Sequence, residues 1–234
     1  MNDAARILAI AVASFLVGSV PFAYIVGKVF FRTDIREHGS GNVGTTNVYR
    51  TFGPLPAIGV LLLDALKGWV PVSSAALLVT GQHQDLAMVV ASLCAIAGHT
   101  FTPFLGFSGG KGIATAAGAL LRLTPMSWAV MMGVFLILVL PTGIISLGSV
   151  VIAALYPVSV YLFYPGRDLL LAFAVVVSAM VLLRHRANIR RLFRGEEKRL
   201  RPGSWRAVAR GRDGGGSEVS PSGGGKVADK ERAG

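Results

Sequence analysis

The sequence contains few charged residues: Asp, Glu, Lys and Arg make up only 15% of its 234 residues. Hydrophobic residues make up 53%, and the mean hydropathy is +0.60. Soluble domains carry about a quarter charged residues. The composition therefore excludes an ordinary soluble protein and predicts an integral membrane protein.

The sequence is also almost without cysteine. Cys94 is the only cysteine and lies inside an apolar run, which excludes an internal disulfide and a cysteine-based metal site. No histidine is followed five positions later by Asp or Glu, so the His-x4-Asp pair of soluble acyltransferases is absent. We expect neither a metal ion nor a cofactor.

Apolar runs divide the chain into candidate membrane spans. The first three cover residues 5–31, 55–79 and 86–104, each long enough to cross about 30 Å of hydrocarbon. Pro21 should kink the first of them. Lys28, Arg32 and Arg36 mark the end of this run, which predicts that this end is cytoplasmic and that the N-terminus lies outside.

Four further apolar runs follow, a short one at about 112–123 and then 127–140, 143–163 and 168–183. Both ends of this region should be cytoplasmic, so the chain must cross an even number of times between them. We predict an all-α polytopic membrane protein with about seven transmembrane helices; merging the shorter runs would give five.

Positive charge is concentrated at the C-terminal end, where residues 184–234 hold 14 of the 23 Lys and Arg. This predicts a cytoplasmic C-terminus that contacts membrane lipid. The region has no recognisable fold or aromatic platform for nucleic acid, so no nucleic-acid partner is expected. We expect a membrane domain over residues 1–203 and a disordered basic Gly/Ser-rich cytoplasmic tail over 204–234.

Three polar stretches interrupt the apolar sequence, and we predict that the spans bring them together on one face. They are Ser40–Arg50 (SGNVGTTNVYR), Gly98–Gly118 (GHTFTPFLGFSGGKGIATAAG) and Arg184–Glu197 (RHRANIRRLFRGEE).

The first stretch offers neutral hydrogen-bond donors and one guanidinium suited to phosphate. The neutral groups are Ser40, Asn42, Thr45, Thr46 and Asn47, and the guanidinium is that of Arg50. The alternative is an interfacial loop whose polar groups cap the next helix. Residues 39–44 also match GxGxxG, but membrane spans surround them instead of a βαβ unit, so we reject a dinucleotide site.

The second stretch places Lys111 among Gly109, Gly110 and Gly112. Glycines leave backbone N–H groups accessible, and a helix beginning just after them adds its positive end, so the pattern predicts a phosphate site. A flexible hairpin with an incidental charge is the alternative. His99, at the start of this stretch, could equally pack in the core or contact a ligand.

In the third stretch, His185 and Asn188 are three residues apart and share a helix face. Most of its arginines are better explained as a cytoplasmic anchor, which needs neither histidine nor asparagine. Asp64 and Lys67 lie one turn apart within the second span, where ionisable residues usually pair. We expect this pair to be structural.

Together these stretches resemble the three motifs of the bacterial acyl-phosphate:glycerol-3-phosphate acyltransferases, the PlsY family. Ser40–Arg50 resembles SGN-x-G-[AT]-x-N-x-x-R, Gly98–Thr115 resembles GH-x-F…GGKG-x-AT, and Arg184–Glu197 resembles RHR-x-NI-x-RL…GE. The resemblance spans about residues 1–197. It implies an inner-membrane enzyme, with its active site facing the cytoplasm, that transfers a fatty acyl group from acyl-phosphate to glycerol 3-phosphate. The product would be lysophosphatidic acid.

The resemblance also implies roles for individual residues. The catalytic set would be Ser40, Arg50, Lys111, His185 and Asn188. The substrate-binding set would be Asn42, Thr46, Asn47, Gly109, Gly110 and Gly112, and Glu196 would be a structural carboxylate. A soluble acyl-phosphate synthase is the expected pathway partner. The alternative function is a transporter of a phosphorylated anion, because intramembrane charges are also typical of transporters.

Overall fold

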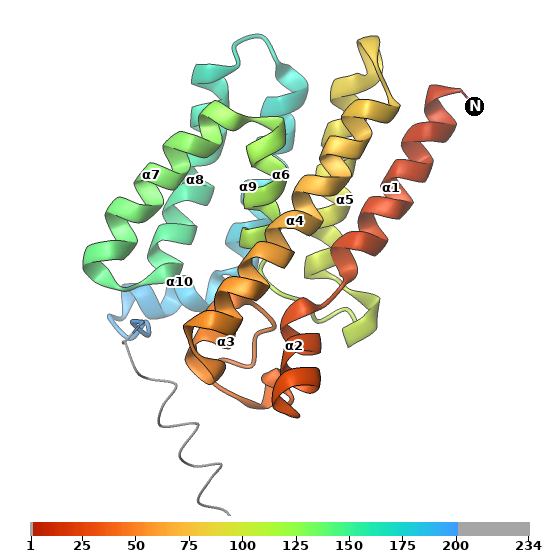
Figure 1. Ribbon diagram of the computed structural model, residues 1–234. Coiled ribbons are helices and arrows are strands. Elements are labelled where there is room, and N and C mark those ends of the chain that lie inside the picture. Colours follow the sequence, from red (N-terminus) through yellow and green to blue (C-terminus); the bar gives the residue numbers. More distant parts are fainter. Residues whose placement is uncertain (1, 201–234) are drawn as a thin grey trace, which may run out of the picture.

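The computed structural model describes residues 2–200 as a bundle of helices, with no strand in that range (Figure 1). The long helices are α1 (Asp3–Ser19), α4 (Pro54–Leu78), α5 (Gln84–Thr100), α7 (Pro125–Thr142), α8 (Ile145–Phe163) and α9 (Asp168–Arg184). The shorter ones are α2 (Phe22–Phe31), α3 (Thr45–Phe52), α6 (Ile113–Leu123) and α10 (Arg186–Phe193), with 3-10 turns at Ile35–Glu37, Gly81–His83 and Pro103–Leu105. The predicted tail over 204–234 lies outside the described residues.

Within residues 2–200, five helical segments are long and apolar enough to cross a membrane, and the pair α9 and α10, bent by 65°, would be a sixth. The five are Asp3–Phe31, Pro54–Leu78, Gly81–Leu105, Pro125–Thr142 and Ile145–Phe163. Helix α6 has 11 residues and spans only about 16 Å, too short for a full crossing. The four runs predicted after the glycine stretch correspond to α6, α7, α8 and α9, and the glycine stretch and α10 lie at the same end of the bundle (Figure 1). The number of crossings stays a prediction.

The first span is broken at Pro21, between α1 and α2, which confirms the predicted kink. A break leaves backbone carbonyls without helical partners. Two of these carbonyls receive side-chain donors from other parts of the chain: Thr102 Oγ1 donates to Ser19 O at 2.7 Å, and Lys67 Nζ donates to Val20 O at 2.7 Å. The break therefore connects the first span to α4 and to the turn after α5.

Helix α6 is held against α4 by two reciprocal glycine contacts. A Cβ on Gly68 would lie 2.0 Å from Thr115 O, and a Cβ on Gly118 would lie 1.8 Å from Ala65 O. Small residues allow membrane helices to approach at backbone distance and pack by van der Waals contact. This contact fixes the beginning of α6 at the end of the bundle where the polar stretches lie.

We predict that Gly118→Ala lowers the free energy of unfolding by about 1–3 kcal/mol, because the added methyl group overpacks the α4–α6 contact. Gly133→Ala in α7 is the matched control, since a Cβ there meets nothing within 4 Å. Thermal unfolding of the purified protein in detergent measures both. Equal unfolding temperatures for the two variants would contradict the packing described here.

Candidate active site

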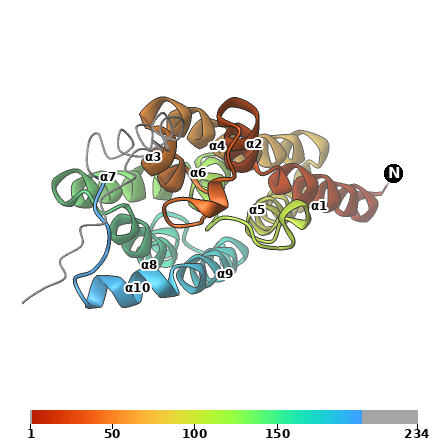
Figure 2. The same cartoon turned by 90° about the horizontal axis from the view of Figure 1, so that it is seen from below.

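The three polar stretches surround one cavity of about 500 Å³ at the α2–α3–α10 end of the bundle. Seen from that end, α3 lies on one side and α8 and α10 on the other, with α6 between them (Figure 2). The predicted site residues that line the cavity are Ser40, Asn42, Thr46, Asn47, Arg50, Asp64, Lys111, Gly112, His185 and Asn188. The predicted assembly of the three stretches on one face is therefore present in the structure.

The loop before α3 is organised by the side chain of Asn47, which is 1% exposed. Its Oδ1 accepts from Ser40 N at 2.8 Å, and its Nδ2 donates to Ile35 O at 3.0 Å and His38 O at 2.9 Å. Both ends of the amide are thus used within the loop. Asn47, predicted to bind substrate, lines the cavity and also holds Ser40 there; its contact with substrate stays a prediction.

Helix α3 begins at the cavity wall, with Thr45 and Thr46 in its first turn. The buried Oγ1 of Thr45 has no hydrogen-bond partner within residues 2–200. Arg50 lies on the same helix and also lines the cavity, and its Nη2 donates to Lys198 O at 3.1 Å. This wall therefore presents a helix N-terminus, hydroxyl groups and a guanidinium, all of which favour an anion.

The glycines before Lys111 pack against the end of α5. Gly109 N donates to Thr100 O and Gly110 N donates to His99 O, both at 3.1 Å. These carbonyls belong to the last turn of α5 and have no partner within that helix. A Cβ on Gly109 would lie 2.0 Å from His99 O, and one on Gly110 would lie 2.1 Å from the His99 ring.

Gly109 and Gly110 were predicted to bind substrate, and the structure gives them a different set of contacts. Gly109 and Gly110 are buried, do not line the cavity, and use their amides internally. Glycine is needed there because the backbone approaches α5 too closely for a side chain. Gly112 differs, since it lines the cavity, precedes α6 and has a φ of +83°, which favours glycine.

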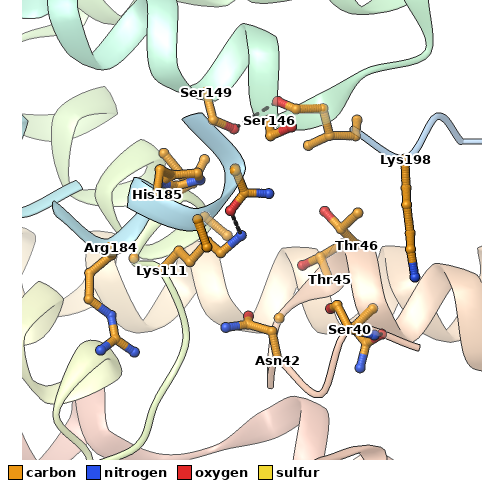
Figure 3. Close-up of a pocket in the computed structure, with 18 of the residues that line it drawn as sticks. Ser40, Asn42, Thr45, Thr46, Lys111, Ser146, Ser149, Arg184, His185 and Lys198 are labelled. Carbon is orange, nitrogen blue, oxygen red and sulfur yellow. Dashed lines mark hydrogen bonds between the residues drawn. The ribbon is translucent and has the colours of Figure 1, made fainter. Parts of the chain in front are cut away.

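Arg184 holds the glycine loop from the third stretch. Its Nη2 donates to Gly109 O at 3.0 Å and to Gly110 O at 3.3 Å, and its guanidinium lies 5.9 Å from the centre of the Phe101 ring. Figure 3 shows Arg184 and Lys111 on one side of the cavity and Lys198 on the other. Sequence reasoning treated Arg184 as a membrane anchor, because its position in an arginine-rich run gave no sign of these contacts.

Lys111 is connected to the third stretch by a chain of hydrogen bonds. Its Nζ donates to Asn188 Oδ1, and Asn188 Nδ2 donates to Glu197 Oε1 at 2.7 Å. The Glu197 carboxylate also accepts from Ser146 Oγ at 2.8 Å and from Arg191 Nε at 2.7 Å. A single carboxylate thus joins α8, α10 and, through Asn188, the glycine loop.

The sequence prediction gave this structural role to Glu196. In the structure the Glu196 side chain is exposed, whereas the Glu197 side chain is 4% exposed and makes the contacts. Burial raises the pKa of Glu197, but hydrogen bonds from Arg191, Asn188 and Ser146 outweigh this effect and lower it overall. We therefore move the structural carboxylate from Glu196 to Glu197.

His185 lies between α9 and α10, and its side chain is 3% exposed. Its Nδ1 is 2.8 Å from Val181 O. A carbonyl only accepts hydrogen bonds, so Nδ1 carries the proton, and Nε2 is an acceptor in the neutral ring. His185 can therefore accept a proton or a hydrogen bond inside the cavity.

The positive charges of the site affect one another. Burial, the largest cause, lowers the pKa of Lys111 to about 8. The nearby charges of Arg191, Arg50 and Arg184 lower this pKa further, while Glu197 opposes them. An anion bound in the cavity would stabilise the protonated form of Lys111. Protonated Lys111 in turn strengthens the binding of that anion.

Asp64 and Lys67 form the buried pair predicted within the second span, with 2.7 Å between Oδ1 and Nζ. Asp64 lines the cavity, but Lys67 does not. The described part of the chain holds no group of three or more His, Cys, Asp or Glu residues that could bind a metal ion. The cavity thus combines the cations Arg50, Lys111 and Arg184 with the carboxylates of Asp64 and Glu197.

Several lining residues were missed by sequence reasoning. Ser146 and Ser149 lie in the first turns of α8, and Phe135 comes from α7. Figure 3 shows both serines on the opposite side of the cavity from Asn42. In the sequence, Ser146 and Ser149 are marked only by their three-residue spacing inside an apolar run. Such a spacing occurs equally in packed helices, so it does not indicate a functional site.

This arrangement, an anion-binding cavity at one end of an apolar helical bundle, defines an integral membrane protein that acts on a phosphorylated or otherwise anionic molecule. Residues 8–195 match the family model for glycerol-3-phosphate acyltransferase. The chain belongs to this family.

Individual relatives agree with this assignment. Glycerol-3-phosphate acyltransferase 2 of Moorella thermoacetica is 44% identical, over 83% of this chain and 97% of the relative. The glycerol-3-phosphate acyltransferase of Geobacter sulfurreducens is 41% identical, over 83% of this chain and 97% of the relative.

Two crystal structures of PlsY, an integral membrane glycerol 3-phosphate acyltransferase, are also similar. The glycerol 3-phosphate form is 32% identical with a TM-score of 0.77, and the match covers 84% of this chain and 96% of that one. The lysophosphatidic acid form is 30% identical with a TM-score of 0.75, and the match covers 86% and 99%.

We predict that Glu197→Ala lowers the free energy of unfolding by about 1–3 kcal/mol, because Arg191 and Asn188 lose a buried acceptor. Glu196→Ala is the matched control and should change it by less than about 0.5 kcal/mol, since that side chain is exposed. Thermal unfolding in detergent compares the two. A larger loss for Glu196→Ala would return the structural role to Glu196.

Proposed function

We propose that this glycerol-3-phosphate acyltransferase takes its fatty acyl group from acyl-phosphate and forms 1-acyl-glycerol-3-phosphate and inorganic phosphate. Its relatives carry the name of the acyltransferase, and the similar PlsY structures are glycerol 3-phosphate and lysophosphatidic acid forms. These support glycerol 3-phosphate as acceptor and lysophosphatidic acid as product. The identity of the donor rests on the chemistry of the cavity.

The observation that supports an acyl-phosphate donor is the presence of cations on two walls of one cavity. Arg50 and Lys198 lie on the α3 side, and Lys111 and Arg184 on the glycine-loop side. Two phosphate groups, one on each substrate, match this distribution. Acyl-phosphate is a mixed anhydride with a good leaving group, so positioning and oriented positive charge supply much of the catalysis.

The proposed reaction is a direct transfer. A hydroxyl oxygen of glycerol 3-phosphate forms a bond to the acyl carbon, and the bond from that carbon to the phosphate oxygen breaks. The phosphate leaves with the electron pair. The hydroxyl proton passes either to Nε2 of His185 or to a phosphate oxygen of a substrate, since both are acceptors within the cavity.

Ser40 is proposed to donate a hydrogen bond to substrate instead of attacking the acyl group. Its side chain is exposed at the cavity, and within residues 2–200 its Oγ has no hydrogen bond to a base. A serine nucleophile requires an adjacent base to activate it. Lys111 would bind the phosphate of glycerol 3-phosphate, and Asn188 and Arg50 would orient and neutralise the phosphate groups.

The apolar wall of the cavity suits the acyl chain. It includes Leu61 of α4, Ile113 of α6 and Phe135 of α7, and Leu61 is 43% exposed. We propose that the chain lies among these helices and that the cavity faces the cytoplasm at the inner membrane. A soluble acyl-phosphate synthase would then supply the donor from the same side. A transporter is not favoured, because the polar motifs are gathered at one end.

The donor is tested with purified protein, radiolabelled glycerol 3-phosphate and either palmitoyl phosphate or palmitoyl-CoA. We expect labelled lysophosphatidic acid only with palmitoyl phosphate, and a loss of about 100-fold or more in Lys111→Ala, as for other single groups that stabilise transferred charge. Gly133→Ala serves as the matched control for expression and folding. Product from palmitoyl-CoA alone would contradict the proposed donor.

The pH dependence tests the role of Lys111. A lysine is charged below its pKa, so kcat/KM for glycerol 3-phosphate should fall as the pH rises through about 8 and Lys111 loses its proton. Lys111→Arg keeps its charge over this range, so its kcat/KM should start lower but stay flat. An equally steep fall in Lys111→Arg would mean that another group titrates.

A further inference from the structure

The His99 ring packs against the glycine loop and lines the same cavity, but the proposed reaction gives it no role. His99 is 6% exposed and occupies the last turn of α5. Its backbone carbonyl accepts from Gly110 N at 3.1 Å, and its Nε2 would be 2.1 Å from a Cβ on Gly110. The ring is therefore in close contact with the residue that precedes Lys111.

The other edge of the same ring faces Asp64, with 3.7 Å between Nδ1 and Oδ1. Asp64 is fixed in turn by Lys67, whose Nζ lies 2.7 Å from Oδ1 and donates to Val20 O at 2.7 Å. A continuous row of buried groups thus runs from the break in the first span, through α4, to the end of α5. A carboxylate beside Nδ1 favours the tautomer with its proton on that nitrogen and fixes the ring orientation.

We propose that His99 and Asp64 are positioning residues that hold the glycine loop so that Lys111 reaches the substrate phosphate. Arg184 binds the carbonyls of Gly109 and Gly110 from one side, and His99 supports Gly110 from the other. A glycine-rich segment loses much conformational freedom when it is ordered, so it needs such external support. The inference rests on the proposed role of Lys111 in binding glycerol 3-phosphate and adds the residues through which that role is achieved.

A double-variant cycle between Gly110 and His99 tests this proposal. Gly110→Ala should raise KM for glycerol 3-phosphate by about tenfold, because the methyl group meets Nε2 and displaces the loop. His99→Ala should raise it several-fold, because the loop loses its support. In the double variant the methyl group has room, so its KM should be no higher than that of His99→Ala alone.

Two further measurements distinguish a displaced glycine loop from a general loss of folded structure. KM for palmitoyl phosphate should change by less than about twofold in each variant, whereas a loosened fold would raise both constants. His99→Gln, whose amide extends roughly as far as Nε2, should recover most of the loss seen in His99→Ala. Gly59→Ala in α4, where a Cβ meets nothing within 4 Å, is the matched control for adding a methyl group.

Equilibrium binding of radiolabelled glycerol 3-phosphate, measured without any acyl donor, repeats the cycle independently of catalysis. Weaker binding in both single variants, without a further loss in the double variant, supports the proposal. The proposal would be overturned if the loss of affinity in the double variant equalled the product of the losses in the two single variants. Unchanged binding in His99→Ala would also overturn it. Wild-type protein that binds glycerol 3-phosphate but forms no product with palmitoyl phosphate would instead count against the proposed donor.

Discussion

The contact between the glycine loop and the last turn of α5 determines where Lys111 lies, and the rest of the site depends on that position. The end of α5 leaves the carbonyls of His99 and Thr100 without helical partners, and the amides of Gly110 and Gly109 satisfy them. Only glycine allows this approach, because a Cβ at either position would fall about 2 Å from an atom of His99. The chain then turns at Gly112 directly into α6.

The position of Lys111 places its positive charge close to other cations and next to the Glu197 carboxylate. Burial and neighbouring cations disfavour the charged form of Lys111, and they lower its pKa to about 8. Glu197, held by Arg191, Asn188 and Ser146, offsets part of this cost without occupying the loop itself. In the proposed function, the remaining positive charge favours the binding of anionic substrates, and the apolar walls accommodate the acyl chain.

Much of the fold could be predicted from the sequence, because hydropathy and helix breaks are local properties. The apolar runs correspond to the long helices, the break falls at Pro21, and α6 begins directly after the glycine stretch. The assembly of three distant stretches around one cavity was also predicted, since each lies at the same end of its helices. The short α6 shows the limit of this reasoning: hydropathy identifies an apolar helix but does not say whether it crosses.

The roles of individual site residues were harder to predict, because they depend on contacts between distant segments. Asn47 and Gly109 have the residue types of a phosphate site, yet their polar groups are used to build the loops. Glu196 and Glu197 are chemically identical neighbours, and only the turn after α10 decides which one faces inward. Ser146 lies within an apolar run, where its contact with Glu197 leaves no trace in the sequence.

The central claim is that one cavity holds both anionic substrates at once and that the acyl group passes directly between them. Initial rates measured while the concentrations of palmitoyl phosphate and glycerol 3-phosphate are varied together test this most directly. Direct transfer predicts double-reciprocal lines that intersect, because both substrates must be bound before any product leaves. Parallel lines, the signature of a covalent acyl-enzyme formed before the acceptor binds, would contradict the account.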